Sequence, residues 1–83
     1  MHSPLRQQLL DQVLLIIEQA RPLVATVARR DRDLGSQLRR ALSSVGLNLS
    51  EGFGSAGGNA RLRFDSARGS LYEAQAGLRL AVA

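Results

Sequence analysis

Arginine is the residue type best able to do chemistry in this 83-residue chain, because it supplies every basic side chain. The sequence holds 11 basic and seven acidic residues, which gives a net charge of +4, and it contains no lysine. Guanidinium groups bind phosphate or carboxylate through two parallel hydrogen bonds and stack on bases, which lysine does not do. The isoelectric point near 11.4 makes polyanions the expected partners. A GC-rich genome that favours arginine codons is the alternative explanation.

Two groups of arginines have positions suited to a phosphate backbone. On a helical wheel, three of them fall within about 40° of one another and form a basic ridge. Four others surround a polar turn. The ridge consists of Arg61, Arg68 and Arg79, and the turn group of Arg29, Arg30, Arg32 and Arg39. We predict that these seven residues bind nucleic acid through phosphate contacts; the alternative is that the ridge is a solvated helix face.

Residues that enzymes use as nucleophiles or metal ligands are scarce. Cysteine is absent and the single histidine, His2, lies near the start of the chain. Neither a nucleophile–base pair nor a zinc site is therefore expected. The glycine-rich stretch 52–58 lacks the preceding strand and following Lys-Ser/Thr of a nucleotide-binding loop. We expect a protein that is not an enzyme, with no cofactor, no metal and no small-molecule substrate.

Apolar residues recur at helical spacing in three stretches, which predicts an all-α fold in a single domain, 1–83. The predicted helices span about 4–30, with a kink near Pro22, and 34–53 and 60–83. The candidate N-caps are Ser3 for the first helix, Asp31, Asp33 or Ser36 for the second, and Asn59 for the third. The longest apolar run, 13–17, is too short for a membrane span, and no signal peptide is recognisable. A cytoplasmic protein without membrane association is expected.

These helices carry more apolar surface than a three-helix core can cover. The third helix has two small or apolar stripes, whereas a surface helix needs one. The chain also ends within this pattern, so we expect a longer protein or cover supplied by other copies. The residues predicted to line an oligomer interface are Leu47, Ser43, Gly46, Leu62, Gly69 and Leu80.

Five polar residues lie on helices that are expected to have little free surface: Arg40, Asn48, Glu51, Ser70 and Glu73. Buried charges are costly unless they are paired. A structural contact of Arg40 with Glu51 or Glu73 is therefore predicted. The alternative is that all five side chains are solvated and unpaired.

Ordered motifs in the second and third helices resemble those of a known family. The motifs are Gln37-Leu-Arg-Arg-Ala41, Asn48-Leu-Ser-Glu-Gly52, and Ala67-Arg-Gly-Ser70 followed by Glu73. With them, the sequence resembles the 23S rRNA-intervening-sequence protein family, often called four-helix bundle protein. The family usually has a proline near Gly46, which this sequence lacks, and the first helix matches only as a generic amphipathic helix.

The resemblance implies an antiparallel four-helix bundle that assembles into rings, commonly pentamers. Three helices are expected in this chain, with the fourth absent or supplied in the oligomer. Relatives include the accessory variability determinant of diversity-generating retroelements, which resembles a basic ring that engages nucleic acid. We therefore predict a cytoplasmic homo-oligomer that binds RNA or DNA through phosphate contacts. The alternative is a structural scaffold or adaptor that binds a protein partner and has no affinity for nucleic acid.

Overall fold

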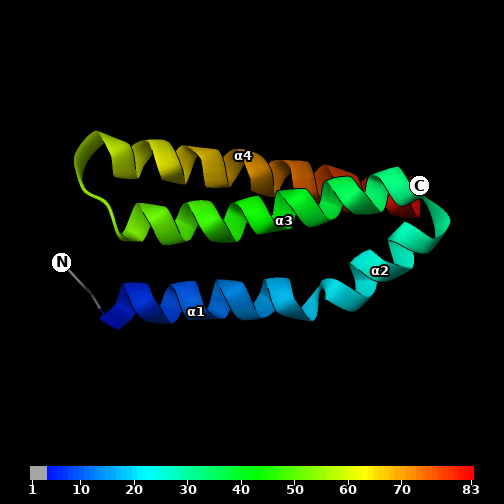
Figure 1. Cartoon of the computed structure of the whole chain (residues 1–83), viewed down its shortest axis with the longest axis horizontal. Coiled ribbons are helices and arrows are strands. Elements are labelled where there is room, and N and C mark those ends of the chain that lie inside the picture. The colour runs from blue at the N-terminus through cyan, green and yellow to red at the C-terminus, as the bar shows by residue number, and fades with distance from the viewer. Residues whose placement is uncertain (1–3) are drawn as a thin grey trace.

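A computed structural model describes residues 4–83, which form four α-helices. The helices are α1 (Pro4–Gln19), α2 (Arg21–Arg30), α3 (Arg32–Phe53) and α4 (Gly57–Val82). No strand occurs in the described residues, so the predicted all-α class is confirmed. Figure 1 shows α3 in the middle, with α4 running back along one side of it and the α1–α2 arm along the other. The predicted Ser3 cap lies outside the described residues.

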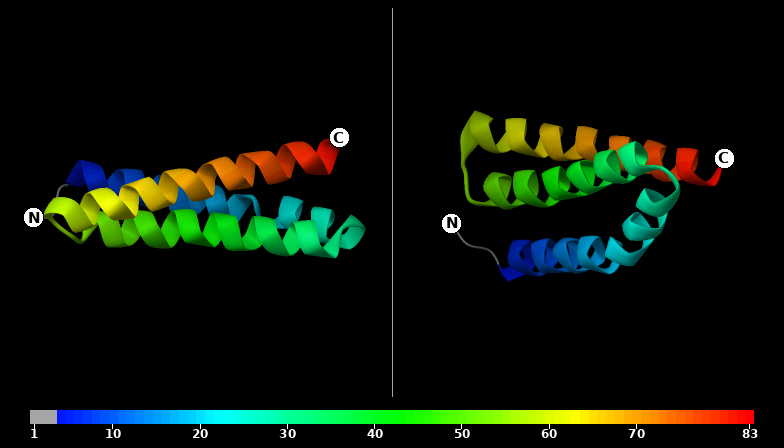
Figure 2. Two further views of the ribbon diagram at one scale, coloured as in Figure 1. Left: turned by 90° about the horizontal axis from the view of Figure 1, so that it is seen from above. Right: turned by 45° about the vertical axis from the view of Figure 1, so that its right-hand side comes forward.

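The kink predicted near Pro22 is a break between α1 and α2, visible as a change of direction in Figures 1 and 2. The backbone N–H of Ala20 is shared between the carbonyl oxygens of Ile16, at 3.0 Å, and Ile17, at 3.2 Å. Pro22 has no N–H to donate to the carbonyl of Glu18, which would continue the α-helical ladder. The proline instead stands in the first turn of α2, where its fixed φ is tolerated.

A single residue turns the chain from α2 into α3. Asp31 has extended backbone angles, and its carboxylate accepts a hydrogen bond from the Leu34 N–H at 3.1 Å. This is the N-cap arrangement that ends one helix and starts the next within one residue. Of the three candidate caps, Asp31 is therefore the one used, and α3 begins two residues before the predicted position.

The turn into α4 differs from the prediction. Gly57 has a φ of +64° and already belongs to α4, which begins three residues earlier than expected. Asn59 consequently lies inside the first turn and is not the N-cap; its side-chain amide donates to the hydroxyl of Ser55 at 3.1 Å. A positive φ is available to glycine without strain, so Gly57 makes the tight entry possible.

Helices α3 and α4 share the largest interface, and small residues bring them together. Ala41, Ala67 and Ala74 are buried between them. A Cβ built on Gly77 would lie 2.7 Å from Leu38, and one on Gly52 would lie 2.6 Å from the Phe64 ring. The two helix axes can therefore approach more closely than larger residues at these positions would allow.

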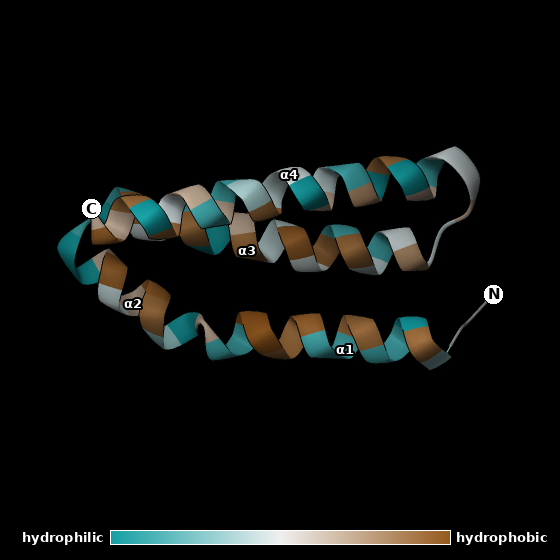
Figure 3. Cartoon of the chain, turned by 180° about the vertical axis from the view of Figure 1, so that it is seen from behind, coloured by the Kyte–Doolittle hydropathy of each residue, from teal (hydrophilic) through white to brown (hydrophobic). Residues whose placement is uncertain are grey.

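The core is concentrated where α2, the first half of α3 and the end of α4 meet. Leu38, which is 1% exposed, packs there with Val24 and Val27, and Leu34, Leu42, Leu78 and Ala81 surround this cluster. Leu10 is the one buried residue among those described in α1. Figure 3 shows apolar segments along the whole of α1, so much of its apolar surface remains uncovered. No described helix is long and apolar enough to cross a bilayer.

Candidate nucleic-acid interface

The positive charge of the chain is collected at one end of the molecule. We call this end, made of residues 21–42 and 72–83, the basic end. The Leu38–Gly77 and Ala28–Gly35 contacts hold its segments together, and Figure 1 places the C-terminus beside the α2–α3 corner. Its arginines are Arg21, Arg29, Arg30, Arg32, Arg39, Arg40 and Arg79, and its acidic residues are Asp31, Asp33 and Glu73.

The other half of the described chain is neutral. Residues 4–20 and 43–71 contain four arginines and four carboxylates, so their formal charges cancel. The basic end therefore carries the whole side-chain net charge of +4. Polyanions respond to the local potential, so this placement matters more than the modest total.

The seven predicted nucleic-acid residues are all exposed, but the structure divides them. The turn group joins Arg79 at the basic end. Arg61 and Arg68 lie in the neutral half, and a guanidinium nitrogen of Arg68 is 3.7 Å from a carboxylate oxygen of Asp65. Arg61 and Arg79 are 18 residue steps apart, or about 27 Å at 1.5 Å per residue, so the two ends of the ridge lie in different electrostatic surroundings. Arg21 and Arg40, absent from the predicted set, belong to the basic end.

A ladder of polar side chains crosses the α3–α4 interface. The Asn48 amide donates to the carbonyl oxygen of Ser44 at 2.9 Å and to its hydroxyl at 3.0 Å, and the Ser70 hydroxyl donates to the Ser44 hydroxyl at 2.8 Å. Arg63 donates to the side-chain oxygen of Asn48 at 3.5 Å. Its Nε lies 2.9 Å from a carboxylate oxygen of Glu51, but its N–H is not aligned for a hydrogen bond, so the contact is chiefly electrostatic.

The pairing predicted for Arg40 is wrong, because Arg63 occupies its place beside Glu51. Arg40 and Glu73 are exposed, and neither forms an ion pair within residues 4–83. On the helical wheel, position 40 points about 160° away from Leu38, the centre of the α3 core face, whereas Arg63 shares a face with the buried Ala67 and Ala74. That shared face was the sequence signal for Arg63. Both side chains of the Arg63–Glu51 pair are about half exposed, so it contributes at most about 1 kcal/mol.

The predicted interface residues are mostly open to solvent. Leu47, Leu62 and Leu80 are each more than 60% exposed, Ser43 is exposed, and nothing lies within 4 Å of a Cβ built on Gly69. The prediction that Gly46 lines an oligomer interface is wrong. Gly46 is buried within the chain, and a Cβ there would lie 3.0 Å from the Leu14 side chain and 3.4 Å from that of Ile17. Gly46 therefore serves the approach of α1 to α3 within the chain.

The predicted interface residues did not include a stripe of exposed apolar side chains on α1. Leu5, Leu9 and Ile16 project to one side of the helix with exposed fractions of 64%, 49% and 63%. Their spacing puts them within about 40° of one another on the wheel. We call these three residues the α1 stripe.

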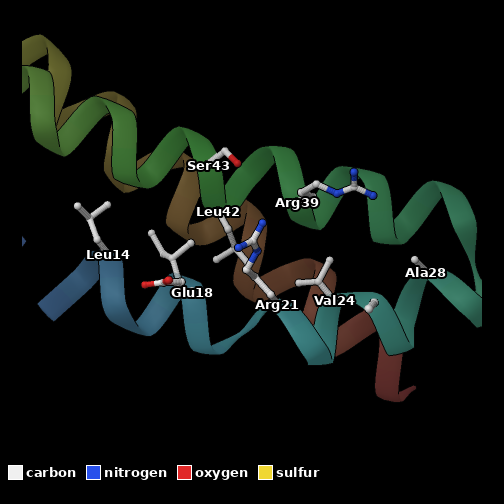
Figure 4. Close-up of a pocket in the computed structure, with 10 residues that line it drawn as sticks. Leu14, Glu18, Arg21, Val24, Ala28, Arg39, Leu42 and Ser43 are labelled. Atoms are coloured by element: carbon white, nitrogen blue, oxygen red, sulfur yellow. The ribbon is translucent and has the colours of Figure 1, made fainter. Parts of the chain in front are cut away.

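A pocket of about 590 Å³ lies between the α1–α2 arm and α3 (Figure 4). We call it the interhelical pocket. It is lined by Leu14, Ile17, Glu18, Arg21, Val24, Ala25, Ala28, Arg39, Leu42 and Ser43. Within residues 4–83 no group of three His, Cys, Asp or Glu side chains comes close enough to hold a metal ion.

Comparison with known proteins relates the chain to one family. The family model described as 23S rRNA-intervening sequence protein matches residues 11–83. The match includes α2, α3, α4 and the greater part of α1. No curated protein and no solved structure matches the chain.

Proposed function

This chain belongs to the 23S rRNA-intervening sequence protein family, and we propose that it is a non-enzymatic, self-associating scaffold that binds RNA through phosphate contacts. The family name supports a connection with RNA. The observation that carries the proposal is the basic end, where seven arginines outnumber three carboxylates. The neutral remainder of the chain leaves this end as the natural docking face for a polyanion.

Arginine at the basic end suits the backbone of RNA better than its bases. The exposed guanidiniums of Arg29, Arg30 and Arg32 stand around the α2–α3 corner, where each can form paired hydrogen bonds with phosphate oxygens. Such contacts release counterions. The logarithm of the binding constant therefore falls with the logarithm of the salt concentration, with a slope of about 0.7 to 0.9 per phosphate contact. Binding led by these contacts has little preference for sequence and applies to DNA as well.

Self-association is supported by the surface of the single chain. Its accessible area is 6190 Å², whereas a folded monomer of 9.0 kDa exposes about 4,850 Å². Its radius of gyration is 13.8 Å, against about 11.8 Å for a compact chain of this length. The excess of about 1,300 Å² exceeds the roughly 800 Å² that each partner contributes to a standard interface.

We propose that copies complete an antiparallel four-helix bundle. The α1–α2 arm, α3 and α4 would take three of its positions, and a helix of a neighbouring chain would take the fourth. The α1 stripe and the exposed leucines of α4 are the surfaces that such a neighbour would cover. Closure of these contacts into a ring, for which a pentamer is our specific proposal, would bring several basic ends together. Affinity would then rise through multivalency without any new contact in each subunit.

A protein adaptor without affinity for nucleic acid is the second candidate. The exposed side chains of Leu47, Leu62 and Leu80 favour it, because they lie outside the basic end or point away from the chain's own core. Exposed apolar groups of this kind are common at protein interfaces. The two candidates differ in their response to RNA.

Fluorescence anisotropy of labelled RNA and of a matched DNA duplex separates these candidates. We expect micromolar or tighter binding at about 50 mM salt that weakens strongly by about 200 mM. The combined Arg30→Gln and Arg32→Gln variant should lose about tenfold or more in affinity. The matched control is the Arg61→Gln, Arg68→Gln variant in the neutral half, which should lose much less. A clean oligomer that binds neither nucleic acid at low salt would contradict RNA binding and favour the adaptor.

A further inference from the structure

The interhelical pocket owes its existence to two glycine contacts and one helix break. A Cβ on Gly35 would lie 2.5 Å from the Cβ of Ala28, so α2 touches the α3 backbone there. At Gly46 the side chains of Leu14 and Ile17 of α1 approach, lying 3.0 and 3.4 Å from a built Cβ. These contacts are 11 residues, or about 16 Å, apart on α3, and the break at Ala20 lies opposite the stretch between them. The arm therefore meets α3 on both sides of the break and leaves a pocket between these two contacts.

The size and lining of the pocket suit a ligand that is partly apolar. About 590 Å³ falls within the range of small-molecule sites. Aliphatic side chains form most of its wall, with Val24 buried and Leu42 half-buried. Ala25, Ala28 and Ser43 are small, so they leave the space unfilled.

Charged groups without partners stand at the rim. Glu18, Arg21 and Arg39 line the pocket, and within the described residues none of the three forms an ion pair. In Figure 4 the Arg21 side chain points from the arm toward α3, whereas the Glu18 carboxylate extends along the arm, away from Arg21. Two unpaired guanidiniums beside an aliphatic wall are complementary to a flat apolar group that carries an anion.

We propose that the interhelical pocket binds one nucleotide whose base is unstacked. The base lies against the aliphatic wall, and Arg21 and Arg39 hold its phosphate. This inference deepens the proposed function and rests on it, because both arginines belong to the basic end. Single-stranded RNA presents such bases, whereas a duplex keeps them paired and stacked.

Glu18 gives the pocket a preference among bases. An ionised carboxylate only accepts hydrogen bonds. The Watson–Crick edge of guanine presents two adjacent donors, N1–H and the N2 amino group, which match the two carboxylate oxygens. Adenine lacks this pair of donors, so guanine is the preferred occupant.

Filling the pocket tests the proposal without removing an arginine. Ala25 is exposed and lines the pocket, so Ala25→Leu reduces the space while leaving the core intact. The matched control is Ala76→Leu, at an exposed position on α4 outside the pocket lining. We expect Ala25→Leu to weaken binding of a single-stranded RNA by about tenfold and to leave binding of a duplex RNA of equal length unchanged. Ala76→Leu should match the wild type with both RNAs, and urea unfolding should verify that both variants fold.

The failures of the two proposals are distinguishable. Wild-type binding of both RNAs, unaffected by Ala25→Leu, would overturn the nucleotide pocket and leave phosphate-led RNA binding standing. If Ala25→Leu leaves RNA binding unaffected but changes the oligomer mass of the protein, the occupant of the pocket would be another copy of the chain. If neither RNA binds, equilibrium dialysis with GMP decides. Saturable GMP binding lost in Ala25→Leu would support a free-nucleotide pocket, and no GMP binding would overturn it together with the RNA proposal.

Glu18→Gln tests the base preference separately. The wild type should bind single strands containing guanine more tightly than adenine-only strands, and the variant should lose that difference. Glu73→Gln, at an exposed carboxylate outside the pocket, is the control. A guanine preference that survives Glu18→Gln would overturn the role of Glu18.

Discussion

Individual glycines in this chain have opposite roles that depend on what lies across from them. Gly35 contacts the backbone of Ala28, with the built Cβ 2.6 Å from that residue's Cα. Gly69 is also in a helix but faces open space. One glycine is therefore required by packing, whereas the other only weakens its helix.

The two glycines should respond in opposite directions to alanine. Gly35→Ala places a methyl group against the α2 backbone, which should destabilise the protein by about 1–3 kcal/mol. Gly69→Ala should stabilise it by about 0.5–1 kcal/mol, because alanine is the better helix former. Urea unfolding at one fixed protein concentration measures both changes. Equal effects of the two substitutions would contradict the packing assigned to Gly35.

The helices differ in how much of their stability comes from the chain itself. Helix α3 packs along its length against α4 and α2, and hydrogen bonds from Ser70 to Ser44 and from Arg63 to Asn48 cross the α3–α4 interface. Helix α1 buries Leu10 and leaves Leu5, Leu9 and Ile16 exposed. Burial of apolar area is the dominant stabilising contribution, so α1 is the helix that gains least stability from contacts within the chain.

Hydrogen exchange should separate α1 from the α3–α4 pair. At low protein concentration the amides of α1 should exchange through openings of low free energy, while those around Leu38 and Ala74 exchange at much higher cost. As the concentration rises, protection should increase most in α1, because the proposed association would cover the α1 stripe. Uniform protection at every concentration would show that α1 is stabilised within the single chain.

The whole molecule is elongated, with extents of 44 × 22 × 16 Å, and it exposes more surface than a monomer of its mass. The charge is also unequally distributed, with the basic end opposite a neutral half. Association through the apolar surfaces would leave the arginines of the α2–α3 corner free. RNA binding and self-association, the two parts of the proposed function, would therefore use different regions of the surface.

Light scattering should detect the association and locate it. We expect a mass that is a multiple of 9.0 kDa for the wild type. The Leu9→Glu, Ile16→Glu variant should shift this mass toward the monomer, because the α1 stripe would then place charges in the interface. The control variant Gln37→Glu, Gln75→Glu adds the same charge at exposed positions on α3 and α4, away from the α1 stripe, and should remain associated. Loss of mass in both variants would indicate charge repulsion and would contradict an interface on the α1 stripe.

Several features of this protein follow from local sequence. Apolar spacing placed the helices to within a few residues, since helical periodicity is a property of neighbouring positions. The Asp31 cap and the break near Pro22 are also local effects, because a carboxylate reaches an N–H three residues on and proline lacks its own N–H. The motifs around Asn48 and Ser70 indicated the family, which the match over residues 11–83 confirms.

Tertiary structure alone decided what depends on the register between helices. It placed Arg63 beside Glu51 in place of Arg40, and it turned Gly46 toward α1. It also gathered arginines from α2, α3 and α4 at one end and opened a pocket opposite the break at Ala20. Residues far apart in sequence meet only after helices have packed at particular faces and offsets. A one-dimensional periodicity gives the face of each helix but neither its neighbour nor the offset between them.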